Sequence, residues 1–239
     1  MEYPSEYRSL RPGGTSLTRQ LLSLGGELKN RRVLEVGCGR GETAALLARE
    51  FGASVIGVDL SEARISECRE KYPELTFMTA DAKALPFGDG SFDVLVSECS
   101  FSVFSDPQKA FREAGRVLVP QGKLLLSDLW QRGGLPAGKG MVRSLYTRET
   151  WLDMAVCAGF IQTEFLDVRE ALTQMYVQMI FDLGLEGAQR QIGLCLQPEE
   201  MKKVSYMLLA GKKNERFLPE IAGVLENEMS QNPSVVCYK

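Results

Sequence analysis

The chain has 239 residues, a net charge of −3 and a hydrophobic fraction of 44%, which suits one large α/β domain or a domain with a cap. The charge excludes the basic excess that is usual in nucleic-acid-binding proteins. No apolar run approaches the roughly 20 residues that cross a bilayer, and the first residues lack the apolar region of a signal peptide. We therefore expect a cytoplasmic protein with no nucleic-acid partner and no membrane partner.

The first expected element is a helix that follows a polar arm. Its leucines recur at helical spacing, and the glycine pair at 25–26 ends it. From residue 31 onward, strand-like and helical segments alternate. The expected strands cover residues 31–36, 54–60, 75–81, 91–98, 123–130 and 160–170. The expected helices between them cover residues 41–52, 61–72, 106–118 and 147–160, and Ser61 and Asp106 are the residue types that cap helix N-termini.

This alternation predicts an α/β fold with a parallel sheet and helices on both faces. The second half departs from the rhythm, because a Met- and Gln-rich helical stretch over 170–199 comes before a strand at 202–213. Residues 214–239 are expected to form a last helix and a tail. Because no linker is evident, we interpret 1–239 as a single domain, with an arm and helix at 1–30 and a core at 31–168.

The histidine and cysteine contents limit the chemistry. The chain has no histidine and six cysteines, none of them in a C-x-x-C pair. The missing imidazole excludes Ser-His-Asp and Cys-His catalysis and removes the commonest zinc ligand. Reduced thiols are expected rather than a disulfide framework. Acid–base catalysis must therefore use Asp, Glu, Tyr, Lys or Cys, and no metal site is expected.

A glycine-rich turn joins the first core strand to its helix. In VLEVGCGRG, residues 33–41, the glycines Gly37, Gly39 and Gly41 read G-x-G-x-G, one residue shorter than a dinucleotide fingerprint. Glu35 lies two positions before the first glycine. A carboxylate at this place fits a pyrophosphate poorly.

Acidic residues recur where the other strands end. In open α/β sheets, ligands bind outside the carboxyl ends of the strands. Asp59, Asp81, Glu98 and Asp128 stand at four of these ends. A row of carboxylates at this edge of the sheet suits a ligand with hydroxyls, an amine, an ammonium group or a positive sulfur. Asp59 follows the glycines at the distance expected of a carboxylate that accepts hydrogen bonds from a ribose diol.

The ordered motifs resemble those of the class I S-adenosylmethionine (SAM)-dependent methyltransferases. VLEVGCGRG looks like the glycine motif of that family, and VIGVDLS looks like its acidic second strand. TADAKALPFGDGSFDVLVSE and AFREAGRVLVPQGKLLLSD resemble the stretches that follow, so the likeness covers 31–130 and extends to about 168. It implies a doubly wound, seven-stranded, mostly parallel Rossmann-like sheet with an antiparallel last strand and a helical lid at 170–199.

The resemblance implies SAM as the cofactor and assigns ten positions to its binding. Asp59 would hold the ribose hydroxyls, Asp81 would accept from the adenine amine, and the glycine turn would face the methionine part. Arg40 departs from the small residue usual in that turn. The expected cofactor-binding residues are Glu35, Gly37, Cys38, Gly39, Asp59, Leu60, Asp81, Ala82, Glu98 and Cys99.

The predicted activity is transfer of a methyl group from SAM to a small-molecule acceptor. The subgroup that looks most similar includes quinone C-methyltransferases and arsenite methyltransferases. Glu98 and Tyr146 are the candidate catalytic residues, with Asp128 as a further candidate base. Two alternatives stay open: a SAM-binding sensor or partner subunit without transferase activity, and a thiol-dependent arsenite methyltransferase. The acceptor atom and the oligomeric state also stay open.

Overall fold

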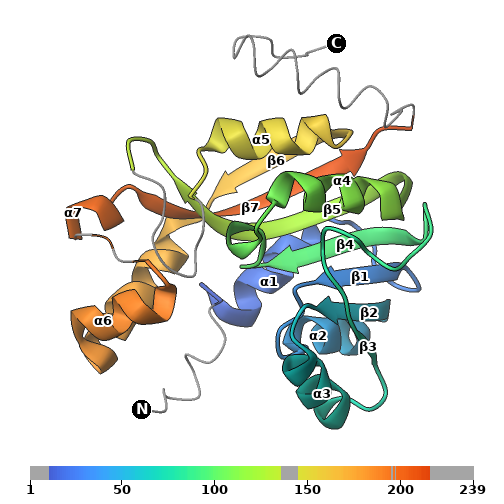
Figure 1. Cartoon of the computed structure of the whole chain (residues 1–239), viewed down its shortest axis with the longest axis horizontal. Helices are drawn as coiled ribbons and strands as arrows, with labels where there is room; N and C mark the ends of the chain where they lie inside the picture. The colour runs from blue at the N-terminus through green and yellow to red at the C-terminus, as the bar shows by residue number, and fades with distance from the viewer. Residues whose placement is uncertain (1–10, 136–144, 195, 197, 216–239) are drawn as a thin grey trace.

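The structure, a computed structural model, describes residues 11–135, 145–194, 196 and 198–215. The expected arm up to residue 10 and nearly all of the expected last helix and tail lie outside these residues. Within them, seven strands form one sheet in the order β3-β2-β1-β4-β5-β7-β6 (Figure 1). The strands are β1 (Arg32–Val36), β2 (Ser54–Asp59), β3 (Thr76–Thr79), β4 (Phe92–Glu98), β5 (Leu118–Gln131), β6 (Phe160–Asp167) and β7 (Val204–Lys213).

The sheet is parallel from β3 to β5, and β7 runs antiparallel to both β5 and β6. This confirms the predicted doubly wound, mostly parallel sheet with an antiparallel last strand. The strand order reverses between β1 and β4, which is where open α/β sheets bind ligands. The glycine turn after β1 stands at that reversal.

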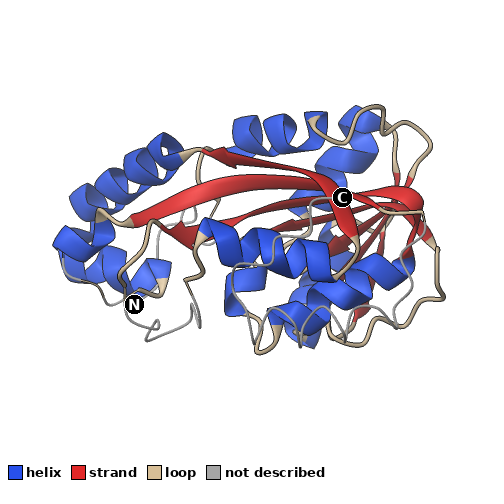
Figure 2. Ribbon diagram, turned by 90° about the horizontal axis from the view of Figure 1, so that it is seen from above, coloured by secondary structure: helices blue, strands red, loops and turns tan. Residues whose placement is uncertain are grey.

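Helices cover both faces of the sheet (Figure 2). They are α1 (Gly14–Ser23), α2 (Glu42–Phe51), α3 (Glu62–Lys71), α4 (Pro107–Val117), α5 (Arg148–Cys157), α6 (Arg169–Ile192) and α7 (Pro198–Met201). One apolar layer joins α1, α2, α3 and α6 to the sheet. The other joins α4 and α5 to the opposite face. Because both faces are buried, the strands carry runs of apolar residues rather than strict alternation.

Two helix starts have the predicted caps. The Asp106 carboxylate accepts from the Lys109 N–H at 2.9 Å, and Pro107 is the first residue of α4. The Ser61 hydroxyl accepts from the Arg64 N–H at 3.4 Å at the start of α3. Each cap satisfies one of the amides that a helix N-terminus leaves without a partner.

The predicted boundaries were wrong in the second half of the sheet. The sixth strand ends at Asp167 rather than at 170, because α6 begins at Arg169, whose N–H donates to the Asp167 carboxylate at 3.1 Å. The last strand starts at Val204 rather than at 202, after the short helix α7. The predicted helical insertion is confirmed as α6 and α7. None of the helices described is long and apolar enough to span a membrane.

Candidate cofactor and acceptor site

The glycine turn has a backbone that only glycine adopts easily. Gly37, Gly39 and Gly41 have φ of 72°, 53° and 73°, in the left-handed region. A Cβ on Gly37 would lie 2.3 Å from the Ser100 hydroxyl oxygen, so that position also needs the space. A Cβ on Gly39 would meet no atom within 4 Å. The turn is therefore packed against the protein at Gly37 and open at Gly39.

Two adjoining cavities lie at the carboxyl ends of β1, β2 and β4. The larger has a volume of about 560 Å³, and the second has a volume of about 260 Å³. Gly37, Cys99 and Ser100 are among the residues that line both. All ten residues that the sequence predicted for cofactor binding line one of these two cavities. The larger is lined by Glu35, Gly37, Cys38, Gly39, Glu98 and Cys99, and the second by Gly37, Asp59, Leu60, Asp81, Ala82 and Cys99.

Asp59 is held in place by the backbone around it. Its carboxylate accepts from the N–H groups of Gly39 and Ser61, each at 2.9 Å, and the Arg64 guanidinium lies 3.7 Å away. Asp81 is less constrained, because its side chain is 41% exposed and accepts from the Lys83 N–H at 2.9 Å. Both carboxylates keep oxygen lone pairs for a ligand in the second cavity.

Glu35 is a buried carboxyl group without a full set of partners. Its side chain lines the larger cavity, and the residue is 4% exposed. Its Oε2 atom has no hydrogen-bond partner among the residues that the structure describes. Burial raises the pKa of Glu35 well above its ordinary value, and the nearby Glu98 carboxylate adds to this. An unsatisfied acceptor of this kind is costly, so a ligand that donates to it gains affinity.

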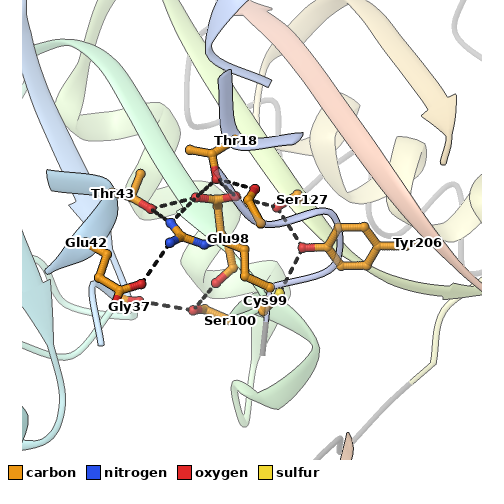
Figure 3. Close-up of polar contacts among 11 residues, drawn as sticks. Thr18, Gly37, Glu42, Thr43, Glu98, Cys99, Ser100, Ser127 and Tyr206 are labelled. Carbon is orange, nitrogen blue, oxygen red and sulfur yellow. Dashed lines mark hydrogen bonds and ion pairs between the residues drawn. The ribbon is translucent and has the colours of Figure 1, made fainter. Parts of the chain in front are cut away.

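Glu98 has its oxygens engaged by side chains from two helices (Figure 3). The Thr18 hydroxyl donates at 3.0 Å from α1, and the Thr43 hydroxyl donates at 2.7 Å from α2. The Arg11 guanidinium lies 3.8 Å away, and the Ser127 hydroxyl donates at 3.4 Å. Sequence reasoning missed these partners. These contacts hold the Glu98 side chain in one position and occupy both of its oxygens.

A third, apolar cavity of about 80 Å³ adjoins the first two at the end of β4. Leu172, Met175 and Ile192 of α6 form part of its wall, as the prediction of a lid requires. Cys99 lines all three cavities, with a φ of 53° that is rare outside glycine. Phe181, by contrast, is 86% exposed on α6, so the Met-rich stretch is only partly a cavity wall.

Asp128 of β5 and Tyr206 of β7 add polar groups to the wall of the third cavity. Both carboxylate oxygens of Asp128 accept backbone N–H groups, from Ser102 at 2.9 Å and from Leu129 at 2.7 Å. Burial raises the pKa of Asp128 to about 6. Tyr206, which the sequence analysis did not single out, places its hydroxyl oxygen 2.8 Å from the Cys99 sulfur. Cys99 and Tyr206 both keep their protons, because burial raises the pKa of each.

Tyr146 lies elsewhere. Its ring packs edge-on against Trp151, with the ring centroids 5.7 Å apart, in the apolar layer under α5. It lines none of the three cavities. The structure therefore offers no contact that supports the predicted catalytic role of Tyr146.

The thiols do not gather around one point. Cys38 and Cys68 lie together beneath the glycine turn, where the Cys68 thiol donates to the Gly39 carbonyl at 3.3 Å. Cys99 lies at the end of β4. Within the described ranges, no group of three or more Cys, Asp or Glu side chains could hold a metal ion. Cys195 and Cys237 lie outside those ranges, so the arsenite alternative gains no support from the geometry.

Known proteins match the region that forms the cavities. A family described as a methyltransferase domain matches residues 34–126. Methyltransferase GfsG of Streptomyces halstedii is 29% identical over 233 residues, which cover 88% of this chain and 84% of that protein. Demethylmenaquinone methyltransferase of Thermus thermophilus is 37% identical over 115 residues, which cover 46% of this chain and 52% of that protein.

A solved structure shares the fold. Geranyl diphosphate methyltransferase in complex with SAM superposes with a TM-score of 0.73 at 18% identity, over 83% of this chain and 85% of that one. The match of residues 34–126, the relatives of nearly full length and the sheet order agree with one another. Residues 34–126 therefore match a methyltransferase domain, and the whole chain is similar in sequence and in fold to methyltransferases.

Proposed function

We propose that this protein binds SAM in the two cavities beside the glycine turn and transfers its methyl group to a small acceptor in the apolar cavity. The observation that carries this assignment is the position of Cys99, which lines all three cavities. A ligand in the first two and a ligand in the third therefore meet at the end of β4. In this arrangement Cys99 forms part of the wall at the point of transfer.

The residues present fit SAM. The unsatisfied Glu35 Oε2 atom and the open space at Gly39 suit the amino-acid end of the cofactor in the larger cavity. Asp59 and Asp81 suit the ribose hydroxyls and the adenine amine in the second. When bound, SAM supplies a methyl carbon that its positive sulfur already activates. What remains for the protein is to position the acceptor, exclude water and accept a proton where the acceptor carries one.

The third cavity indicates an apolar acceptor. Its wall combines aliphatic side chains of α6 with Pro12 and Leu129. Met175 adds a flexible thioether, which adapts its shape to different occupants. The cavity has a volume of about 80 Å³, so we propose that it takes a small acceptor, or the reacting end of a larger one. The alternative is a SAM-binding protein without transferase activity, and methyl transfer to small acceptors separates the two.

The first experiment is calorimetric titration of the protein with SAM and, separately, with NAD. We expect SAM to bind and NAD not to bind, since the acidic turn disfavours a pyrophosphate. Release of S-adenosylhomocysteine in the presence of small acceptors then tests the transfer itself. A folded protein that binds NAD, or that binds neither ligand, contradicts the proposed cofactor. SAM binding without methyl transfer to any acceptor favours the sensor or partner-subunit alternative.

We also propose a cytoplasmic location. Cys38, Cys68 and Cys99 are free thiols in the structure, and thiols persist in reducing compartments. Imaging of the tagged full-length protein in its native cell tests this location, and a signal outside the cytoplasm contradicts it.

A further inference from the structure

Four polar side chains form a hydrogen-bonded chain from the apolar cavity to Glu98 (Figure 3). The Cys99 sulfur lies 2.8 Å from the Tyr206 hydroxyl, and the Tyr206 hydroxyl lies 2.9 Å from the Ser127 hydroxyl. The Ser127 hydroxyl lies 3.4 Å from Glu98 Oε2. Tyr206 and Ser127 are each 1% exposed. The chain therefore runs through the interior, across β7, β5 and β4.

The direction of donation along this chain is fixed by counting protons. Serine and tyrosine each have one hydroxyl proton. The Ser127 proton goes to the Glu98 carboxylate, which can only accept. The Tyr206 proton must then go to Ser127. The Cys99 thiol is left as the donor to Tyr206. Every proton in the chain therefore points from the apolar cavity toward Glu98.

The hydrogen-bonded chain joins two of the cavities. Tyr206 lines only the apolar cavity, Cys99 lines all three, and Glu98 lines the larger cavity beside the glycine turn. The Thr18 and Thr43 hydroxyls donate to Glu98, and the Arg11 guanidinium lies 3.8 Å from it. A proton released in the apolar cavity can therefore reach the Glu98 carboxylate, which borders the larger cavity, through side chains of this protein.

We propose that Tyr206 is a catalytic residue that takes a proton from a hydroxyl acceptor, and that Ser127 and Glu98 carry this proton away. The proposal rests on the proposed function, because it concerns the acceptor in that same site. It assigns the substrate class as apolar molecules with a phenolic or enolic hydroxyl. Ser127 acts through Tyr206 and is a positioning residue.

The proton balance of the step is closed by groups on this chain. In this step the bond between the acceptor oxygen and the methyl carbon would form as the sulfur–methyl bond and the acceptor O–H bond break. The electron pair of the sulfur–methyl bond would stay on sulfur, which gives S-adenosylhomocysteine. The acceptor proton passes to the Tyr206 oxygen as the Tyr206 proton passes to Ser127. The Ser127 proton passes to Glu98, whose carboxylate becomes the neutral acid. Glu98 then returns its proton to water through the larger cavity.

A hydroxyl is the acceptor for which such a relay matters most. A phenol or an enol is a weak acid, so it remains largely protonated near neutral pH and needs a base. An aromatic thiol is a stronger acid and ionises in mildly alkaline buffer without help. A relay variant should therefore lose phenol methylation and keep thiol methylation. A variant that has only disturbed the cavity should lose both.

The experiment uses three probes of matched shape: 4-methylphenol, 4-methylaniline and 4-methylbenzenethiol. Release of S-adenosylhomocysteine is measured for the full chain and for Tyr206→Phe and Ser127→Ala. We expect the native protein to methylate 4-methylphenol faster than 4-methylaniline. In both variants kcat for the phenol should fall by about 100-fold or more, the low end of what a positioned base contributes. Turnover of the thiol should stay within about 3-fold.

Tyr72→Phe serves as the matched control. Tyr72 is another buried tyrosine, 7% exposed, and its ring packs near Phe77 away from the three cavities. It should methylate all three probes as the native protein does. Calorimetry with SAM, run on every variant, should give native affinity and so separate loss of the relay from loss of the cofactor.

Each other outcome overturns part of the proposal. Equal losses for phenol and thiol would mean that Tyr206 and Ser127 only support the cavity. Unchanged phenol turnover in both variants would remove the relay. Faster turnover of 4-methylaniline, or no turnover of 4-methylphenol by a protein that binds SAM, would overturn the substrate class. Failure to bind SAM at all would instead contradict the proposed function.

Discussion

The Gly39 N–H donates to the Asp59 carboxylate across 2.9 Å, which ties the glycine turn after β1 to the end of β2. The same carboxylate accepts from the Ser61 N–H, so it also fixes the start of α3. These contacts hold Asp59 in one position before any ligand arrives. A ligand that donates to Asp59 therefore does not have to order it, which preserves the affinity gained from each hydrogen bond.

Replacing Asp59 by alanine should weaken SAM binding by about 1.5–3 kcal/mol, the range for hydrogen bonds to a charged group. Calorimetry measures this directly. Glu70→Ala is the matched control, because Glu70 is an exposed carboxylate on α3 that lines none of the cavities. Native SAM affinity in Asp59→Ala would show that the ribose lies elsewhere.

Alanine at Gly37 and at Gly39 should have different effects. At Gly37 the added Cβ meets the Ser100 side chain at 2.3 and 2.7 Å, so strain and overpacking together should cost about 2–5 kcal/mol of stability. At Gly39 only the backbone strain of about 1–2 kcal/mol applies, since the space is open. We expect SAM to occupy that space, however. Gly39→Ala should therefore lose more free energy of SAM binding than free energy of unfolding. Urea unfolding and calorimetry on both variants check the contrast, and equal stability losses would contradict it.

Glu35→Gln should stabilise the ligand-free protein and weaken its binding of SAM. Burial raises the pKa of Glu35 in the folded state, so its contribution to stability is present at low pH and is lost as the pH rises through the raised value. Glutamine does not titrate, and the advantage of the variant should grow with pH. Its SAM affinity should fall by about 1.5–3 kcal/mol if the Glu35 carboxylate binds the cofactor. Urea unfolding at several pH values measures the change in stability, and calorimetry measures the change in SAM affinity. A variant that is less stable than the native protein at high pH would contradict the expected stabilisation.

Asp128 should make the folded state less stable as the pH rises from about 4 to about 7. Its pKa is raised by burial to about 6 in the fold, so folding favours its protonated form. The stabilisation from protonated Asp128 is complete below the pKa that Asp128 has in the unfolded chain, and it is lost as the pH passes about 6. The change is of the order of 3 kcal/mol. The stability of the native protein relative to Asp128→Asn should shrink over this range, whereas a constant difference would show that Asp128 does not titrate there.

The sequence predicted those parts of the fold that local signals specify. Caps at Ser61 and Asp106 are short-range features, and the order of strand, glycine turn and helix places residues at known ends of a sheet. The errors arose where tertiary pairing overrides local signals. The fifth strand was expected to begin at 123, yet it begins at Leu118, which pairs with Phe92 of β4, and it continues through Gln121 with a φ of 65°.

The sequence predicted ten residues that line the two larger cavities, but it did not predict the partners of Glu98 or the place of Tyr206. Those ten residues follow the ends of strands, and parallel strands end at one edge of a sheet. Glu98 was expected to contact the acceptor, but α1 and α2 bring Thr18 and Thr43 to it from 80 and 55 positions away. Tyr206 lies in the last strand, where its spacing matches that of an ordinary core residue. Only the antiparallel pairing of β7 with β5 places it opposite Leu129 and beside Ser127.

The helix α6 breaks at Gly184, with φ 73° and ψ 168°. Leu172 and Met175 precede the break and line the apolar cavity, whereas Arg190 and Gln191 follow it and line the larger one. Ile192 also follows the break and lines the apolar cavity. The α6 residues before Gly184 that line a cavity line only the apolar one, so this segment can vary while the larger cavity keeps its lining. Replacing residues 169–183 of this chain by the matching segment of a relative should therefore transfer the acceptor preference of that relative. Gly184 then marks one junction at which acceptor specificity can be engineered.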